Sequence, residues 1–289
     1  MNGPVYQDLQ MKRKLFCELG PAAYKISLFK EARLKELRDL FAHRRFAVER
    51  SPENFPYIWK GDSKILIRKL HGVDMQLQRN KVVNLKLAAD RIDGIIIRPG
   101  EEFSFWNLVG ATTKKKGYLE GLVISNGRMM QDIGGGMCQM ANMIHWLVLH
   151  TPLTVTELHH HSDALFPDEK RRAPFGTGTS IAYKAIDYRF RNTTEYPVQI
   201  RVWLDDTFLY GEIRGTVDLP DRYRLVEEDS YYAREDDGKF YRNSKVYRVI
   251  TDKTSKEEKA RELILDNHSE VLYDYELIPK DQIREKSDA

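Results

Sequence analysis

The spacing of apolar and polar residues predicts helices in the first half of this chain and strands in the second. Over residues 22–49 apolar side chains recur at helical spacing, although Lys30 and Arg33 interrupt the stripe. The stripe consists of Ala23, Ile26, Phe29, Leu37, Leu40 and Phe41. A second helix is expected over residues 80–93, where Gly94 would end it.

A third helix is predicted directly after three glycines. Residues 140–149 are largely apolar and contain no Gly or Pro, which indicates a helix. Gly134, Gly135 and Gly136 permit a sharp bend of the backbone before it. Cys138 is therefore expected at the N-terminus of this helix.

From residue 154 onward the apolar period shortens to two, which is typical of strands. Strands are expected at residues 154–159, 180–183, 186–192, 198–204 and 208–214. Short polar turns between them favour an antiparallel sheet. Residues 216–289 add tyrosine-rich strands, with a hairpin at Asp236-Asp237-Gly238.

Together these patterns predict an α+β fold. We expect N-terminal helices, a Cys138-headed helix packed on an antiparallel sheet, and a β-rich C-terminal extension. The expected divisions are a basic helical region at 1–60, a core domain at 61–215 and the extension at 216–289.

Composition is that of a soluble globular protein, with 289 residues, 42% apolar and 31% charged. A net charge of +3 makes no case for a nucleic-acid partner. The basic residues concentrate early, since residues 1–50 hold 11 Lys/Arg against 6 acids, a difference of +5. The helix at 22–49 is therefore expected either to pack on the following domain or to rest on an anionic membrane surface.

The sequence shows no signal-peptide pattern and no apolar run of the roughly 20 residues that cross a bilayer. We expect a cytoplasmic location, either free or in peripheral contact with the inner membrane face.

Cys138 is the main candidate for chemistry. A thiol at a helix N-terminus is expected to have a lowered pKa, because the positive end of the helix dipole favours the thiolate. The N–H groups around Gly136 to Gln139, at the glycine turn, are candidates to stabilise an oxyanion.

A histidine-rich stretch follows about twenty residues later. In a strand, His159 and His161 would share one face and His160 the other, so either the pair or His160 alone would meet Cys138. The histidine would accept the thiol proton, and Asp187 or Asn192 would orient its ring.

Two other interpretations of the same residues stay open. Cys138 can be a buried, inert thiol at a tight turn. Alternatively, Cys138, His159 and His161 can be three ligands of a zinc ion, although no CxxC or HxxxH spacing supports this. We expect no cofactor, and we interpret Cys17 as incidental.

Several motifs, in order, resemble the VanW family, which is named for an accessory protein of glycopeptide-resistance gene clusters. The resemblance spans Asn84 to Gly215. Its pieces are Asn84-Leu85-Lys86-Leu87-Ala88-Ala89, Arg98-Pro99-Gly100-Glu101-Glu102-Phe103-Ser104-Phe105-Trp106, Gly134-Gly135-Gly136-Met137-Cys138-Gln139-Met140, His150-Thr151-Pro152-Leu153-Thr154, Glu157 to Ser162, and Asp187 with Arg191-Asn192-Thr193.

The resemblance implies a cell-wall context and L,D-transpeptidase-like chemistry through Cys138, with the family's paired histidines at His159 and His161. Many relatives carry an aspartate shortly after the glycine equivalent to Gly176, where this chain has Gly178, so Asp187 remains as the orienting carboxylate. The leading hypothesis is a thiol acyltransferase or amidase acting on a peptidoglycan peptide or lipid-linked precursor. A non-enzymatic accessory protein and a zinc protein are the alternatives.

Overall fold

The computed structural model describes residues 20–67, 74–125, 128–160, 163–164, 167, 174 and 176–284. The chain divides into two compact units, residues 1–44 and 45–289. In the first unit, the described residues form helix α1 (Pro21–Phe41). The predicted helix over 22–49 is therefore too long at its C-terminal end. Residues 45–50 run extended instead, because Ala47 N–H donates to Glu102 O and Glu49 O accepts from Ile96 N–H, both at 2.9 Å.

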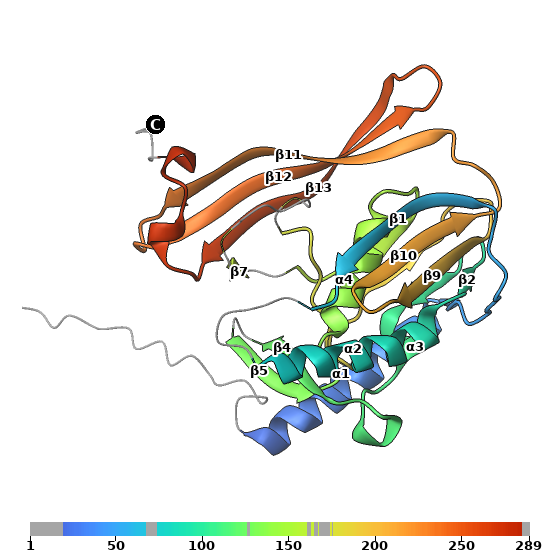
Figure 1. Cartoon of the computed structure of the whole chain (residues 1–289), viewed down its shortest axis with the longest axis horizontal. Coiled ribbons are helices and arrows are strands. Elements are labelled where there is room, and N and C mark those ends of the chain that lie inside the picture. The colour runs from blue at the N-terminus through green and yellow to red at the C-terminus, as the bar shows by residue number, and fades with distance from the viewer. Residues whose placement is uncertain are drawn as a thin grey trace, which may run out of the picture. The chain divides into compact units, whose positions relative to one another are not determined.

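The second unit contains the remaining elements of the fold (Figure 1). Its helices are α2 (Met75–Ile92), α3 (Phe105–Val109) and α4 (Met137–Val148), with short 3-10 helices at Lys114–Lys116, Tyr275–Leu277 and Lys280–Gln282. Its strands are β1 (Tyr57–Ile65), β2 (Ile96–Ile97), β3 (Glu102–Ser104), β4 (Glu120–Ser125), β5 (Arg128–Ile133), β6 (Thr154–Glu157), β7 (Asp163–Ala164), β8 (Arg189–Arg191), β9 (Val198–Leu204), β10 (Phe208–Gly215), β11 (Asp221–Arg234), β12 (Phe240–Asp252), β13 (Glu258–Val271) and β14 (Ile283–Arg284).

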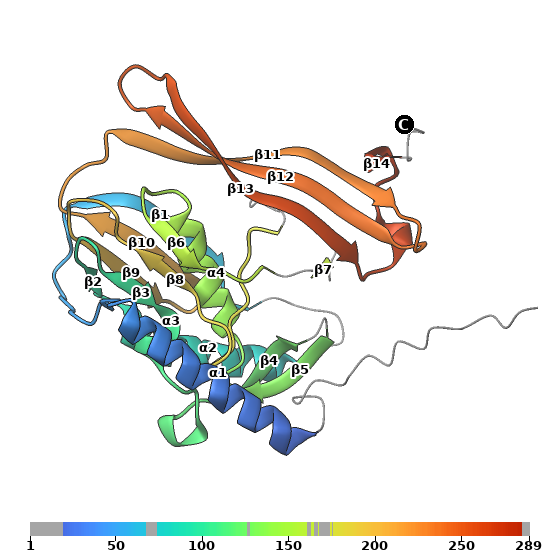
Figure 2. The same cartoon turned by 180° about the vertical axis from the view of Figure 1, so that it is seen from behind.

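The central sheet is antiparallel, in the order β1-β10-β9-β2. Helix α4 lies against one face of it, as Figure 1 shows. Gly211 on β10 leaves room for this packing, since a Cβ there would lie 2.9 Å from a methyl of Leu147 and 3.1 Å from Met143 Cγ. A smaller sheet, β3-β8-β6, is visible beside α4 from behind (Figure 2).

Helix α4 is almost entirely buried, which explains why its sequence is apolar on several faces. Met140, Ile144 and Leu147 are each fully covered in the main core, together with residues of α2, β9 and β10. Helix α2 begins five residues before the predicted helix, because the Asp74 carboxylate caps it by accepting from Gln76 N–H at 2.8 Å.

The C-terminal part forms a separate sheet, in the order β14-β11-β12-β13-β7. The hairpin predicted at Asp236-Asp237-Gly238 is confirmed between β11 and β12, where Gly238 N–H donates to Glu235 O at 2.9 Å. The C-terminal sheet has a small core of its own, which contains Tyr232, Val271 and Ile278, together with Ala164 from β7. These elements confirm the predicted α+β fold with a β-rich C-terminal part. Among the described helices, none is both long and apolar enough to cross a bilayer.

Candidate active site around Cys138

Cys138 lies in the first turn of α4, as the sequence predicted. The helix is preceded by Gly136, whose φ of 105° is favourable only for glycine. Gly135 passes so close to Gly121 that a Cβ on Gly121 would lie 2.9 Å from the Gly135 carbonyl oxygen. The three-glycine motif is thus explained by close backbone packing as well as by the turn.

An amide on α2 fixes this glycine turn. Asn84 is fully buried, and its Nδ2 donates to Gly135 O at 2.9 Å and to Leu119 O at 3.0 Å. Its Oδ1 accepts from Leu119 N–H at 2.8 Å. Because Asn84 hydrogen-bonds the backbone of two separate segments, at Leu119 and Gly135, it fixes the position at which α4 begins and therefore the position of Cys138.

The thiol of Cys138 is covered by the segment that follows Gly176. Its Sγ lies 4.0 Å from Ile181 O, within reach of a weak S–H hydrogen bond. Burial raises the pKa of the Cys138 thiol, and backbone hydrogen bonds from Ile181 and from Cys138 itself lower it by less. The expectation of a lowered pKa was therefore wrong, because loss of water disfavours the thiolate more than the helix N-terminus favours it.

The N–H groups expected to stabilise an oxyanion, from Gly136 to Gln139, are not all available. Gln139 N–H already donates to Gly136 O at 2.9 Å, and the Gln139 side chain donates to Ile65 O at 3.0 Å. In the preceding turn, Gly134 N–H and Gly135 N–H also donate, to Leu119 O and Asp132 O. The candidate oxyanion donors are thus reduced to the N–H groups of residues 136–138.

His159 and His160 do not lie in a regular strand. Strand β6 ends at Glu157, so the alternation of faces expected for His159 and His160 does not apply. His159 O accepts from Ser180 N–H at 2.7 Å, and His160 Nδ1 lies 3.0 Å from Gly176 O. His161 lies outside the described residues. The strand predicted at 180–183 is instead a turn, closed by a bridge between Ala182 and Ile186.

Among the described histidines, His159 has Glu157 rather than Asp187 as its neighbouring carboxylate. Glu157 Oε1 lies 3.6 Å from His159 Nε2 and accepts from the backbone N–H of Asp187 at 2.9 Å. The buried Asp187 carboxylate accepts from Ser104 Oγ at 2.6 Å and from Arg189 Nε at 2.8 Å. It also accepts from the N–H groups of Trp106 and Tyr188. Asn192, the other proposed orienting residue, donates to Ile97 O at 2.8 Å.

A polar stripe on α4 connects the cysteine to this segment. Cys138, Asn142 and His145 follow one another at i, i+4 and i+7 and therefore lie on one face. Asn142 Oδ1 accepts from Thr179 N–H at 2.6 Å, and His145 Nδ1 lies 3.1 Å from Tyr188 Oη. The same face of α4 that carries the thiol thus holds the chain on both sides of Ile181.

His145 is a buried neutral histidine. Burial, with a smaller contribution from the charge of His160, lowers the pKa of His145 from 6.5 to about 3. Its Nε2 is buried without a hydrogen-bond partner in the described part of the protein, so a second ring proton would be unsatisfied. His145 is therefore a packing residue of the buried face of α4.

Within the residues that the structure describes, no three Cys, His, Asp or Glu side chains gather in a way that would hold a metal ion. The zinc alternative also requires His161, which is outside those residues.

Comparison with known proteins assigns the chain to a family. The family model described as "VanW like protein" matches residues 80–214. Vancomycin B-type resistance protein VanW from Enterococcus faecalis is 38% identical over 197 residues, covering 68% of this chain and 71% of the relative. The chain belongs to the VanW family. Another relative is the uncharacterized protein YoaR of Bacillus subtilis, 30% identical over 118 residues, covering 41% of this chain and 37% of YoaR. No solved structure matches the chain.

Two residues of this VanW-family site were not predicted from the sequence. Glu157 is two residues before His159, and Asn142 is one helical turn after Cys138 in an otherwise apolar run. Both are polar residues whose spacing relative to a candidate residue was visible in the sequence. Their contacts with His159 and Thr179 depend on residues distant along the chain, and only the fold brings these together.

Proposed function

We propose that this VanW-family chain is a cysteine-dependent acyltransferase or amidase that acts on peptidoglycan peptides, in the context of glycopeptide resistance. The name of the Enterococcus faecalis relative, a vancomycin B-type resistance protein, supports the context. The observation that carries the chemistry is Cys138 at the head of α4, covered by the segment whose backbone bonds to His159. Cys138 and His159 thus contact neighbouring residues of one segment, which supports a site with a nucleophile and a proton acceptor.

In the proposed reaction, Cys138 Sγ attacks the carbonyl carbon of a substrate peptide bond while its proton passes to a histidine. The tetrahedral intermediate collapses to a thioester, and the departing amine takes the proton from the imidazolium. Attack by a second amine on the thioester then forms a cross-link, whereas attack by water gives hydrolysis. Either step returns the proton to the thiol.

Burial of the thiol determines how the base must work. Because the pKa of Cys138 is raised, the resting side chain is a thiol, and the histidine must remove the proton as the new bond forms. We assign His159 or His161 as this base. Glu157, at 3.6 Å from His159 Nε2, would hold the orientation of the His159 ring.

Alkylation of Cys138 against pH tests this mechanism, with Cys17→Ala as the background. We expect a slow reaction at neutral pH that rises only above the ordinary thiol value of about 8.5. Cys138→Ala should abolish turnover of peptidoglycan stem peptides and leave the fold intact. The turnover of His159→Gln and of His161→Gln should each be compared with that of Cys138→Ala. Only the variant that lacks the base should show the same loss of turnover. Full turnover by Cys138→Ala would refute the mechanism.

A second candidate function is a non-enzymatic accessory protein of the cell wall. The observation that favours it is the same burial, since burial and a raised pKa make a thiol less reactive. In that case Cys138→Ser would retain the biological effect, and no stem peptide would be turned over by the unaltered chain.

We also propose that α1 contacts an anionic membrane surface. Its exposed Lys30 and Arg38 are interleaved with apolar residues along the helix. In vesicle flotation, the full chain should float with anionic but not zwitterionic vesicles, and the double variant Lys30→Glu with Arg38→Glu should not float. A chain that stays in solution with anionic vesicles would contradict this proposal.

A further inference from the structure

A groove opens at the edge of the central sheet, away from the α4 face that carries Cys138. Strand β2 pairs with β9 only at Gln199 and Val198, and Ile95 continues this contact to Ile200. Beyond that point, the Asp93 carboxylate takes the place of a neighbouring strand and accepts from Val202 N–H at 2.9 Å. The edge of β9 from Val202 to Leu204 therefore faces an open space.

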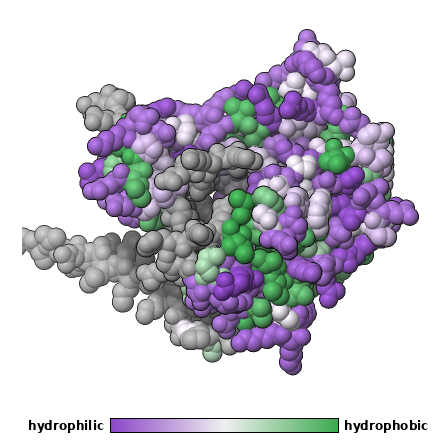
Figure 3. Space-filling view, viewed as in Figure 1, coloured by the Kyte–Doolittle hydropathy of each residue, from purple (hydrophilic) through white to green (hydrophobic). Residues whose placement is uncertain are grey.

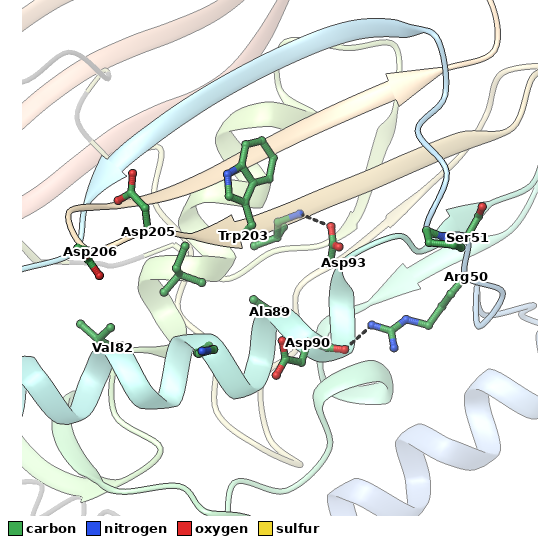
Figure 4. Close-up of a pocket in the computed structure, with 13 residues that line it drawn as sticks. Arg50, Ser51, Val82, Ala89, Asp90, Asp93, Trp203, Asp205 and Asp206 are labelled. Carbon is green, nitrogen blue, oxygen red and sulfur yellow. Dashed lines mark hydrogen bonds between the residues drawn. The ribbon is translucent and has the colours of Figure 1, made fainter.

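This space has a volume of about 640 Å³, within the range of small-molecule sites. One wall is α2, through Val82, Lys86, Ala89 and Asp90, and the other is the end of β9 with its turn. Figure 4 shows Trp203, Asp205 and Asp206 on one side of the groove and the α2 residues on the other. On this side of the molecule, hydrophobic residues form a band between hydrophilic areas (Figure 3).

Trp203 provides an aromatic surface at the groove, and contacts within the protein fix the orientation of its ring. Trp203 is 42% exposed, so part of its ring is open to solvent. The ring stacks on Tyr210, with centroids 5.2 Å apart and planes inclined by 8°. Tyr210 is itself fixed, because its Oη donates to Asp205 Oδ2 at 2.7 Å. The indole is therefore oriented before any ligand arrives.

Polar groups of the groove fall into two sets. Asp93 is engaged by Arg201 at 2.7 Å, and Asp205 accepts from the N–H groups of its own turn. By contrast, in the part of the chain that the structure describes, no hydrogen bond or ion pair engages the carboxylates of Asp90 and Asp206 or the ammonium of Lys86. Arg50 reaches only the backbone oxygen of Asp90 (Figure 4).

The unengaged groups are two acceptors and one donor beside an aromatic ring. An organic cation would suit the ring and the carboxylates, but Lys86 would repel it. An anion would suit Lys86 alone. A sugar matches all of them, because its hydroxyl groups both donate and accept and one face of its ring carries C–H groups that pack on an indole.

We propose that this groove binds a saccharide chain, with one sugar ring stacked on Trp203 and its hydroxyls bonded to the three unengaged polar side chains. This site is separate from Cys138 and requires no cysteine chemistry. A saccharide site would let the protein hold the glycan part of a polymer whose peptide part is processed elsewhere on the same unit.

The test is ligand-observed NMR with the full chain and two flat β-1,4-linked probes, the tetramers of N-acetylglucosamine and of glucose. We expect at least one to bind. Trp203→Ala should weaken binding about tenfold or more, since it removes both the stacking and the buried apolar area. Asp206→Asn and Lys86→Met should weaken it by smaller factors, and Trp203→Phe should retain part of it.

Two control variants test whether binding depends on this groove. Leu263→Ala removes an exposed apolar side chain on β13 and should leave saccharide binding unchanged. Cys138→Ala should also bind normally, so a failure of the acyl-transfer mechanism would not affect the result. Absence of binding to both tetramers, equal binding by Trp203→Ala, or preferential binding of a simple diamine such as cadaverine would overturn the proposal.

Discussion

The cysteine and the histidines of the proposed site lie in two regions that are held by different kinds of contact. Cys138 lies in the first turn of a helix whose apolar side chains, such as Met140 and Ile144, are fully buried in the main core, and Asn84 fixes the turn before it. Beside His159, Leu158 and Ile181 are only partly buried against that core, and backbone hydrogen bonds such as Ser180 N–H to His159 O add to this packing. Full apolar burial therefore fixes the nucleophile, whereas partial burial and polar contacts hold the candidate base.

The histidine-bearing segment has a further support, which is the C-terminal sheet. Strand β7 pairs with β13, and Ala164 is buried in the small core of that sheet. Gly176, whose carbonyl contacts His160, packs against Leu265 and Asn267 of β13. The position of His160 therefore depends in part on a sheet outside the central core.

The largest expected effect is on the cysteine side. Gly135→Ala would place a Cβ against the Gly121 carbonyl carbon, and its nearest neighbours would all be backbone atoms of Gly121. We expect a loss of about 3 kcal/mol in the free energy of unfolding, measured by urea denaturation. Gly61→Ala is the matched control, because its Cβ would meet atoms only at 3.5 Å or beyond. Equal stability of the two variants would show that the glycine turn is not tightly packed.

A second prediction concerns His145, which joins the two regions through Tyr188. Since its pKa falls from 6.5 to about 3 on folding, the unfolded chain takes up a proton below pH 6.5 that the folded chain does not. Stability should therefore fall as pH drops through this window, by about 2 kcal/mol between pH values of about 7 and about 5.

The measurement is urea denaturation at both pH values for His145→Gln, which stays neutral, and for the unaltered chain. His145→Gln should lose this share of the pH dependence, and His43→Gln serves as the exposed control. If both variants keep the full pH dependence of stability, the His145 imidazole is not held buried and neutral between the two regions.

The smallest effect is expected on the histidine side. Gly176 has a φ of 74°, and a Cβ there would lie 2.7 Å from both Leu265 Cδ2 and Asn267 Oδ1. Gly176→Ala should cost about 1–2 kcal/mol and loosen the cover over the thiol, so that Cys138 is alkylated faster. Gly238→Ala carries the same backbone strain, with a φ of 80° and its nearest neighbour at 4.0 Å. Its alkylation rate should stay unchanged, and a change equal to that of Gly176→Ala would remove the contrast between the two regions.

Much of the core could be predicted because local patterns agree with the tertiary structure there. The helix after the three glycines is confirmed as α4, and the strand at 198–204 as β9. The helix at 80–93 was correct in type, but it starts earlier at an Asp74 cap. In each case apolar spacing decides the element, since the buried face must be continuous.

The histidine region could not be predicted in the same way. The residues after Glu157 alternate like a strand, yet their backbone bonds to a loop at Ser180 rather than to a ladder. The pairing partner lies about twenty residues away, and periodicity carries no information about it. For the same reason the sequence predicted Asp187 as the carboxylate next to a histidine, whereas the structure places Glu157 next to His159.

The sequence by itself determined the VanW family, the α+β class and the place of Cys138 at a helix start, because these depend on residue order and short-range spacing. Tertiary structure alone decided the direction of the Cys138 pKa, the carboxylate that meets His159 and the groove beside Trp203. These properties depend on burial and on contacts between distant segments. Water is excluded, or a carboxylate brought near, only when the whole unit has folded.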